Sequence, residues 1–298
     1  MSTPDWSRRL LCLSLSVPVG TALACGPDFP MRLLDDRAQT LSELPEGNFG
    51  FEVNRLGEQL AGLKPTTEMT LTPYWDGDDN DRPYREQRSR IEASELPESL
   101  REKVAQLRAL ADPQQVLKQG AELPDELRLY IAGAVAFDAD DHALAADYFA
   151  KVLALPGEQR KLRSTWAAYS LGRALMARSF EASDDPQQTP QALQAQAREA
   201  FHRARALSAE GFSDPLELGV ASLGEEARLA KLAGDWNSAI QLYASQSRLG
   251  SGSGYSSLRQ LADELVSLPD EQLKALLAQP MPRKLLTAYL LSHVGWDY

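Results

Sequence analysis

Cysteine is scarce in this sequence, which has only Cys12 and Cys25 among its 298 residues. Cys12 falls within an N-terminal apolar stretch of the kind that is removed on export, so Cys25 has no partner for an internal disulfide. Histidine is scarce too. His142, His202 and His293 lie too far apart to form the i, i+4 pair that binds zinc on a helix. We therefore expect no metal and no cofactor, and we expect the histidines to lie on helix surfaces.

Recognisable catalytic motifs are missing as well. The sequence has no G-x-S-x-G elbow and no Walker loop, and "GSGSG" at 250–254 lacks the lysine of a phosphate loop, so we expect a flexible connection between helices there. In "LPESLREK", Glu98 and Ser99 resemble the Glu-Ser pair of lytic transglycosylases in these two letters alone. Pro97 and Glu98 equally suit the start of a helix. We expect no enzymatic activity; the alternative is a domain acting on cell-wall glycan with Glu98 as its acid.

An acidic stretch at 76–87, "DGDDNDRPYREQ", partly matches a calcium-binding loop. Asp76, Asp78 and Asn80 stand at positions one, three and five of an EF-hand-like pattern. Asp81 replaces the glycine that permits the sharp turn, and Gln87 replaces the glutamate that closes the site. The preferred interpretation is a solvated acidic loop, with weak calcium binding as the alternative.

The sequence is also short of positive charge, with 31 lysines and arginines against 42 acidic residues and a net charge of −11. Such a surface repels phosphate backbones and anionic lipid headgroups. This composition argues against nucleic acid as a partner. The hydrophobic content of 43% is that of an ordinary globular protein.

The longest apolar stretch, "LLCLSLSVPVGTALA", is too short to span a bilayer, which needs roughly 20 apolar residues. It follows Arg8 and Arg9 and ends at Ala22-Leu23-Ala24, which is the layout of a secretory signal peptide over residues 1–24. "ALAC" resembles a bacterial lipobox, in which the first mature residue, here Cys25, carries lipid. The family prefers leucine where Ala22 stands, so ordinary cleavage after Ala24 is the alternative. The preferred interpretation is a periplasmic lipoprotein of the outer membrane, which contacts the membrane only through Cys25.

Residues 25–93 predict a loop-rich N-terminal arm. They contain Pro27, Pro30, Pro45, Pro65, Pro73 and Pro83, and they lack sustained helical periodicity apart from a short helix around 51–61. Residues 94–298 instead show apolar residues at spacings of three and four, and alternating β-branched stretches are missing. The fold class is therefore all-α.

The helical part resembles the tetratricopeptide (TPR) family over roughly 126–250. The matching positions are a leucine and a small residue in the first helix of a pair, then an alanine and an aromatic residue in the second. They are Leu129, Gly133, Ala145 and Phe149, then Leu171, Gly172, Ala197 and Phe201, and then Leu223, Ala227, Ala239 and Tyr243. Thirteen extra residues separate Gly172 from Ala197 in the middle pair, and we place them in the turn between its helices. A degenerate pair is expected through 255–279.

This resemblance implies a solenoid of antiparallel helix pairs, in which small residues allow the two helices of a pair to approach closely. A plain helical bundle is the alternative. The outer-membrane TPR lipoproteins that this chain resembles serve as assembly factors, so the implied function is a protein–protein interaction scaffold of the cell envelope. Repeat phasing predicts that Tyr130, Arg173 and Arg228 line the groove that holds envelope proteins or peptides.

Overall fold

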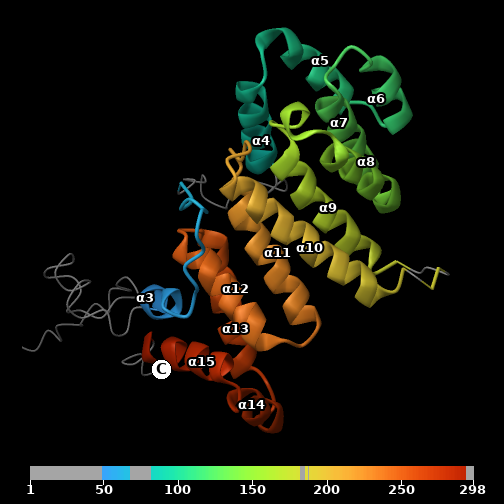
Figure 1. Ribbon diagram of the computed structural model, residues 1–298. Coiled ribbons are helices and arrows are strands. Elements are labelled where there is room, and N and C mark those ends of the chain that lie inside the picture. Colours follow the sequence, from blue (N-terminus) through green and yellow to red (C-terminus); the bar gives the residue numbers. More distant parts are fainter. Residues whose placement is uncertain (1–48, 68–81, 182–184, 187, 293–298) are drawn as a thin grey trace, which may run out of the picture. The chain divides into compact units, whose positions relative to one another are not determined.

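Thirteen α-helices and no strand occupy the part of the chain that this computed structural model describes, namely residues 49–67, 82–181, 185–186 and 188–292 (Figure 1). The predicted all-α class is thereby confirmed. The helices are α3 (Phe49–Asn54), α4 (Arg82–Glu95), α5 (Glu98–Arg108), α6 (Pro113–Gln119), α7 (Asp125–Asp138), α8 (His142–Ala154), α9 (Ser164–Arg178), α10 (Pro190–Ala209), α11 (Leu218–Leu232), α12 (Trp236–Arg248), α13 (Gly252–Val266), α14 (Asp270–Leu277) and α15 (Pro280–Ser292).

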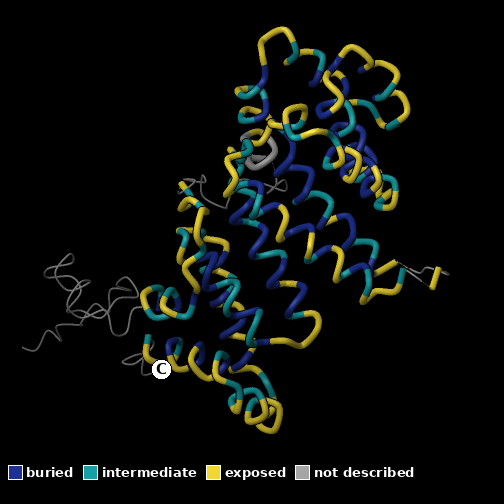
Figure 2. Tube along the Cα trace, viewed as in Figure 1, coloured by how far each residue is buried: buried dark blue, intermediate teal, exposed yellow. Residues whose placement is uncertain are grey.

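From α7 to α12 each helix packs against the helix before it and the helix after it. The buried residues lie on the sides that face neighbouring helices (Figure 2). Two glycines make close approach possible. A methyl group on Gly133 would come within 2.7 Å of the Phe149 ring, and one on Gly172 within 2.5 Å of the Phe201 ring. The small residue and the aromatic residue of the first two pairs are therefore in direct contact.

The turns inside the first and third helix pairs have the same geometry. Asp141 and Asp235 each cap the second helix of their pair, accepting hydrogen bonds of 3.0 Å from the backbone N–H of Leu144 and Ser238. Each follows a left-handed residue, Asp140 at φ 58° or Gly234 at φ 76°. Each also donates its own N–H, over 2.9 Å, to a carbonyl near the end of the first helix. The repeat is therefore visible in backbone geometry as well as in side-chain pattern.

The thirteen extra residues of the middle pair are not all in the turn, as the sequence had suggested. Compared with the first pair, the connection at 179–189 accounts for eight of them. Four extend the start of α10, where Thr189 accepts from the N–H of Ala192 and Pro190 fits the first turn. One lengthens α9. Five of the thirteen extra residues are thus helical, and Leu193 at the start of α10 is buried in the core.

The helical part begins earlier than predicted, since α4 starts at Arg82, within the expected loop-rich arm. Pro83 had been counted as a loop marker, but proline is tolerated in the first turn of a helix. The predicted short helix near 51–61 is α3, at Phe49–Asn54. It packs on α12, α13 and α15 through Phe49 and Val53.

Two expectations about the C-terminal part are corrected. "GSGSG" is the start of a helix: Ser251 caps α13, and a methyl group on Gly254 would meet the backbone nitrogen of Ser247 at 2.7 Å. Gly254 therefore allows α13 to approach α12, and residues 252–254 form the first turn of this helix and not a flexible loop. The expected degenerate pair of α13 and α14 is replaced by packing of α13 on α15, because the short α14 contributes no buried residue.

Candidate functional site

Arg173 and Arg228, the two groove arginines predicted from repeat phasing, lie beside one carboxylate. Arg173 projects from α9 and Arg228 from α11, the first helices of successive pairs, and Glu225 of α11 lies between them. The Nε atom of Arg173 is 3.8 Å from Glu225 Oε1, and Arg228 Nη1 is 3.5 Å from Glu225 Oε2. The arginine side chains are 47% and 58% exposed. Both distances are too long for strong hydrogen bonds, so their N–H donors are not saturated by Glu225.

Aromatic residues hold this group in place. The Tyr169 hydroxyl of α9 donates to Glu225 Oε1 over 3.3 Å, and the Arg173 guanidinium lies 5.2 Å from the centre of the Phe137 ring on α7. Burial, together with the negative charge of Glu225, raises the pKa of Tyr169 well above its usual range. We call Tyr169, Arg173, Glu225 and Arg228 the α9–α11 face. It has two positive charges for one negative charge and a neutral phenol that positions the acid.

Tyr130 does not belong to this face. It is only 7% exposed and packs against the rings of Phe149 and Trp166, so its ring is part of the core. Two guanidinium groups flank it, with Arg108 at 5.2 Å and Arg163 at 5.9 Å from the ring centre. Arg163 also lies 4.5 Å from the Trp166 ring. We call Arg108, Tyr130, Arg163 and Trp166 the arginine–aromatic cluster.

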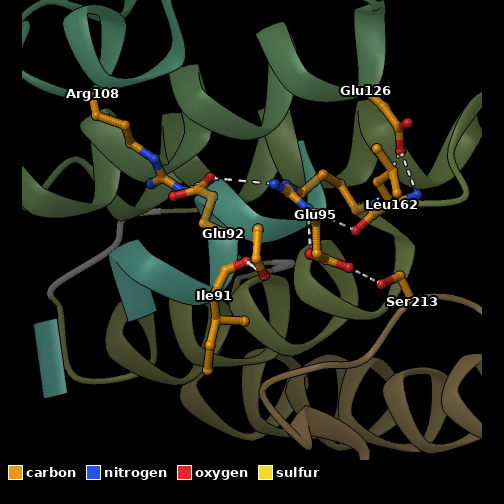
Figure 3. Close-up of polar contacts among 9 residues, drawn as sticks. Ile91, Glu92, Glu95, Arg108, Glu126, Leu162 and Ser213 are labelled. Atoms are coloured by element: carbon orange, nitrogen blue, oxygen red, sulfur yellow. Dashed lines mark hydrogen bonds and ion pairs between the residues drawn. The ribbon is translucent and has the colours of Figure 1, made fainter. Parts of the chain in front are cut away.

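Two glutamates of α4 contact this cluster (Figure 3). Glu92 accepts from Arg108 over 2.8 Å and pairs with Arg163 at 3.5 Å, while Glu95 pairs with Arg163 at 3.1 Å. The hydroxyl of Ser213, in the connection before α11, donates to Glu95. The Arg163 side chain is fully buried, so α4 supplies the charges that its burial requires.

Glu126 also supports the cluster, because it accepts hydrogen bonds of 3.0 Å from the backbone N–H groups of Leu162 and Arg163 (Figure 3). Burial raises the pKa of Glu126, and these two hydrogen bonds oppose the shift. The acid thus fixes the backbone that presents Arg163. We did not predict Glu92, Glu95 or Arg163 from the sequence, in which the only available signal was the spacing of three between the two glutamates.

The other candidate residues lie in ordinary helix positions. Glu98 is exposed in the first turn of α5 and follows Pro97, as expected of a helix start. His142 contacts Glu181 at 2.5 Å and His202 contacts Glu226 at 2.8 Å. Within the described ranges no group of three potential metal ligands occurs. Cys25, His293 and positions 76–81 of the acidic stretch lie outside the described residues.

Comparison of the chain with protein-family models, with curated proteins and with solved structures gave no match. Among the described helices, none is both long and apolar enough to cross a membrane.

Proposed function

We propose that this chain is a TPR-like scaffold that holds a segment of another protein on the α9–α11 face. One observation carries the proposal. Arg173 and Arg228, which come from different helix pairs, share the single carboxylate of Glu225 and remain exposed. A binding protein needs such a surface and needs no reactive centre.

The chemistry of this face favours an acidic segment of the partner. Guanidinium groups bind carboxylates through paired N–H donors, and charge-assisted hydrogen bonds of this kind are stronger than neutral ones. Arg173 and Arg228 have donors that Glu225 leaves unsaturated, since both ion pairs are longer than 3.2 Å. The acidic surface elsewhere would repel the same segment, which limits binding to this face.

The TPR-type interpretation itself rests on two supports. The turn before α8 recurs before α12 with the same cap and the same left-handed residue. The glycine and the aromatic residue of the first two pairs are in contact at the positions that the family uses for close approach. Stacked helix pairs of this kind bury a continuous core between neighbours and leave the first-helix surfaces for partners.

We also propose that the protein is exported and anchored in the outer membrane through Cys25. The support is the sequence alone, namely the apolar stretch that ends at Ala24 and the cysteine that follows it. Intact mass of the mature protein tests this. A lipid-sized mass increase at Cys25, lost in Cys25→Ser together with membrane association, is expected. An unmodified thiol at a mature N-terminal Cys25 would refute the anchor.

The binding proposal is tested by charge reversal. Arg173→Glu combined with Arg228→Glu should reduce recovery of partners from an envelope extract, while the circular dichroism spectrum and melting curve stay unchanged. The control is Arg203→Glu with Arg283→Glu, two other exposed arginines whose reversal changes the net charge equally. Equal recovery by both double variants would refute the assignment of the α9–α11 face. Turnover of cell-wall glycan that is lost in Glu98→Gln would refute the scaffold proposal itself.

A further inference from the structure

We propose that the arginine–aromatic cluster is a second binding site, specific for a helix with two carboxylates one turn apart. In the structure its occupant is α4, through Glu92 and Glu95. An acidic helix of a partner protein would displace α4 from the cluster. This site shares no residue with the α9–α11 face, so the inference is independent of the function proposed above.

The fit between α4 and the cluster defines the ligand. Residues three apart on a helix lie on the same face, so Glu92 and Glu95 reach the cluster together. Arg163 contacts both of them, and Arg108 contacts Glu92 from α5 (Figure 3). Arginine is suited to this role because its planar guanidinium matches carboxylate geometry and lies against aromatic rings. The site is therefore selective for two acidic residues that lie three positions apart on a helix.

The contacts of α4 are those of a bound ligand more than those of a core helix. Among its described side chains Glu92 alone is buried, and none belongs to a hydrophobic cluster of the described chain. The upstream residues 88–90 are exposed. The chain becomes firmly packed only at Leu96, which is buried with α5 and α7. Detachment of the described part of α4, residues 88–95, would thus expose little apolar surface and would end at Leu96.

The cluster also has donors that α4 does not satisfy. The Nε atom of Arg163, the Nε1 atom of Trp166 and the Nε atom of Arg108 are buried and have no hydrogen-bond partner. A buried donor without a partner loses its hydrogen bond to water and gains none in the protein, so it destabilises the site. A ligand helix that brings the same two carboxylates and one more acceptor would therefore bind better than α4 does.

Exchange of one acidic helix for another does not require the cluster to be rebuilt. The main free-energy cost of forming the site is the desolvation of the Arg163 guanidinium, which is already buried in the folded chain. An incoming helix makes the same ion pairs that α4 makes. Its disadvantage is that α4 is tethered and competes at an effective concentration on the order of 1 mM.

The test uses the full chain and a fluorescently labelled peptide of residues 82–97. In the variant Glu92→Lys with Glu95→Lys, repulsion from Arg108 and Arg163 releases α4 and frees the cluster. Fluorescence anisotropy should show that the peptide binds this variant about tenfold or more tightly than it binds the parent chain, because the tethered competitor is gone. A peptide with Gln at both glutamate positions should bind neither chain.

The matched control is Glu98→Lys with Glu102→Lys, which makes the same charge change at two exposed positions of α5. This variant should bind the peptide as weakly as the parent does. Equal binding by all three chains, or equal binding of the Gln peptide, would overturn the proposal.

A second measurement does not depend on any variant folding correctly. Hydrogen exchange of the parent chain should show faster exchange in α4 when the unlabelled peptide is added in millimolar excess, while α9 and α10 stay protected. Unchanged exchange in α4 at saturating peptide would overturn displacement.

Discussion

Gly172 is the position at which the helix-pair packing can be tested most directly. It lies in the middle of α9, and a methyl group there would sit 2.5, 2.7 and 2.8 Å from three atoms of the Phe201 ring on α10. Carbon atoms pack at about 3.5–4.0 Å, so Gly172→Ala forces the ring or one helix to move by roughly 1 Å. Phe201 is fully buried and Tyr169 packs against it, so the ring has little room to move.

The expected magnitude comes from two opposing effects. Alanine in a helix interior is more favourable than glycine by about 1 kcal/mol. Overpacking of a close-packed core costs about 1–3 kcal/mol, and the fully buried ring places this site in the upper part of that range. We therefore expect Gly172→Ala to lower the free energy of unfolding by about 1–2 kcal/mol. Gly172→Leu adds further volume and should be worse.

Urea denaturation followed by circular dichroism measures the effect as a shift in midpoint at constant slope. Gly252→Ala is the matched control: this glycine begins α13, and a methyl group there would meet nothing within 4 Å. It should be neutral or stabilising. Phe201→Leu removes the ring and makes room for the added methyl group. The double variant Gly172→Ala with Phe201→Leu should therefore lose less stability than the two single variants lose in sum. If Gly172→Ala is as stable as Gly252→Ala, the packing argument is wrong.

Substitutions at four further positions test other parts of the structure. Phe149→Ala should lower the free energy of unfolding by about 3–5 kcal/mol because the ring is fully buried. Tyr243→Ala should lower it less because that ring is only partly buried, and a reversed order of urea midpoints would contradict this. Asp141→Ala removes the cap of α8 and should lower the free energy of unfolding by about 1 kcal/mol. Asp141→Asn, which keeps a capping oxygen, should retain most of that stability in the same assay. The raised pKa of Tyr169 means that the unfolded chain ionises first, so stability is lost as pH rises above about 10. In Tyr169→Phe the free energy of unfolding should fall less steeply with pH than in the parent chain, by up to about 1.4 kcal/mol per pH unit. Equal slopes in the two proteins would show that Tyr169 ionises freely.

The helix pairs could be predicted from the sequence because their signal is local and repeated. Gly133 and Phe149 stand sixteen residues apart, and Ala227 and Tyr243 have the same separation. Small and aromatic residues at fixed separations indicate which side of each helix faces its neighbour. The same logic placed Arg173 and Arg228 on one surface, where the structure brings both to Glu225. Repeat phasing therefore carried information about side-chain direction as well as about helix boundaries.

Tyr130 and α4 show where this reasoning fails. Tyr130 has the correct phase for a first-helix surface, but the segment before α9 and the end of α5 bring Arg163 and Arg108 over its ring. Those segments lie outside the repeat pattern, so no periodicity within α7 predicts them. The sequence of α4 is mostly polar and contains Pro83, and such a helix has no continuous apolar stripe from which it could be predicted. Its polar partners come from three different parts of the chain: Arg108 and Arg163 form ion pairs with it, and Ser213 donates a hydrogen bond.

Net charge is a poor guide to what this protein can hold. A total of −11 predicts repulsion of anions at a distance, and that conclusion applies to polyanions such as nucleic acid. At contact distance the local charges decide instead. Arg163 is fully buried and meets two carboxylates within 3.5 Å, and Arg173 and Arg228 outnumber the single acid between them. We therefore expect carboxylates to bind only where those arginines lie, which would give the protein a selectivity that a uniformly basic surface lacks.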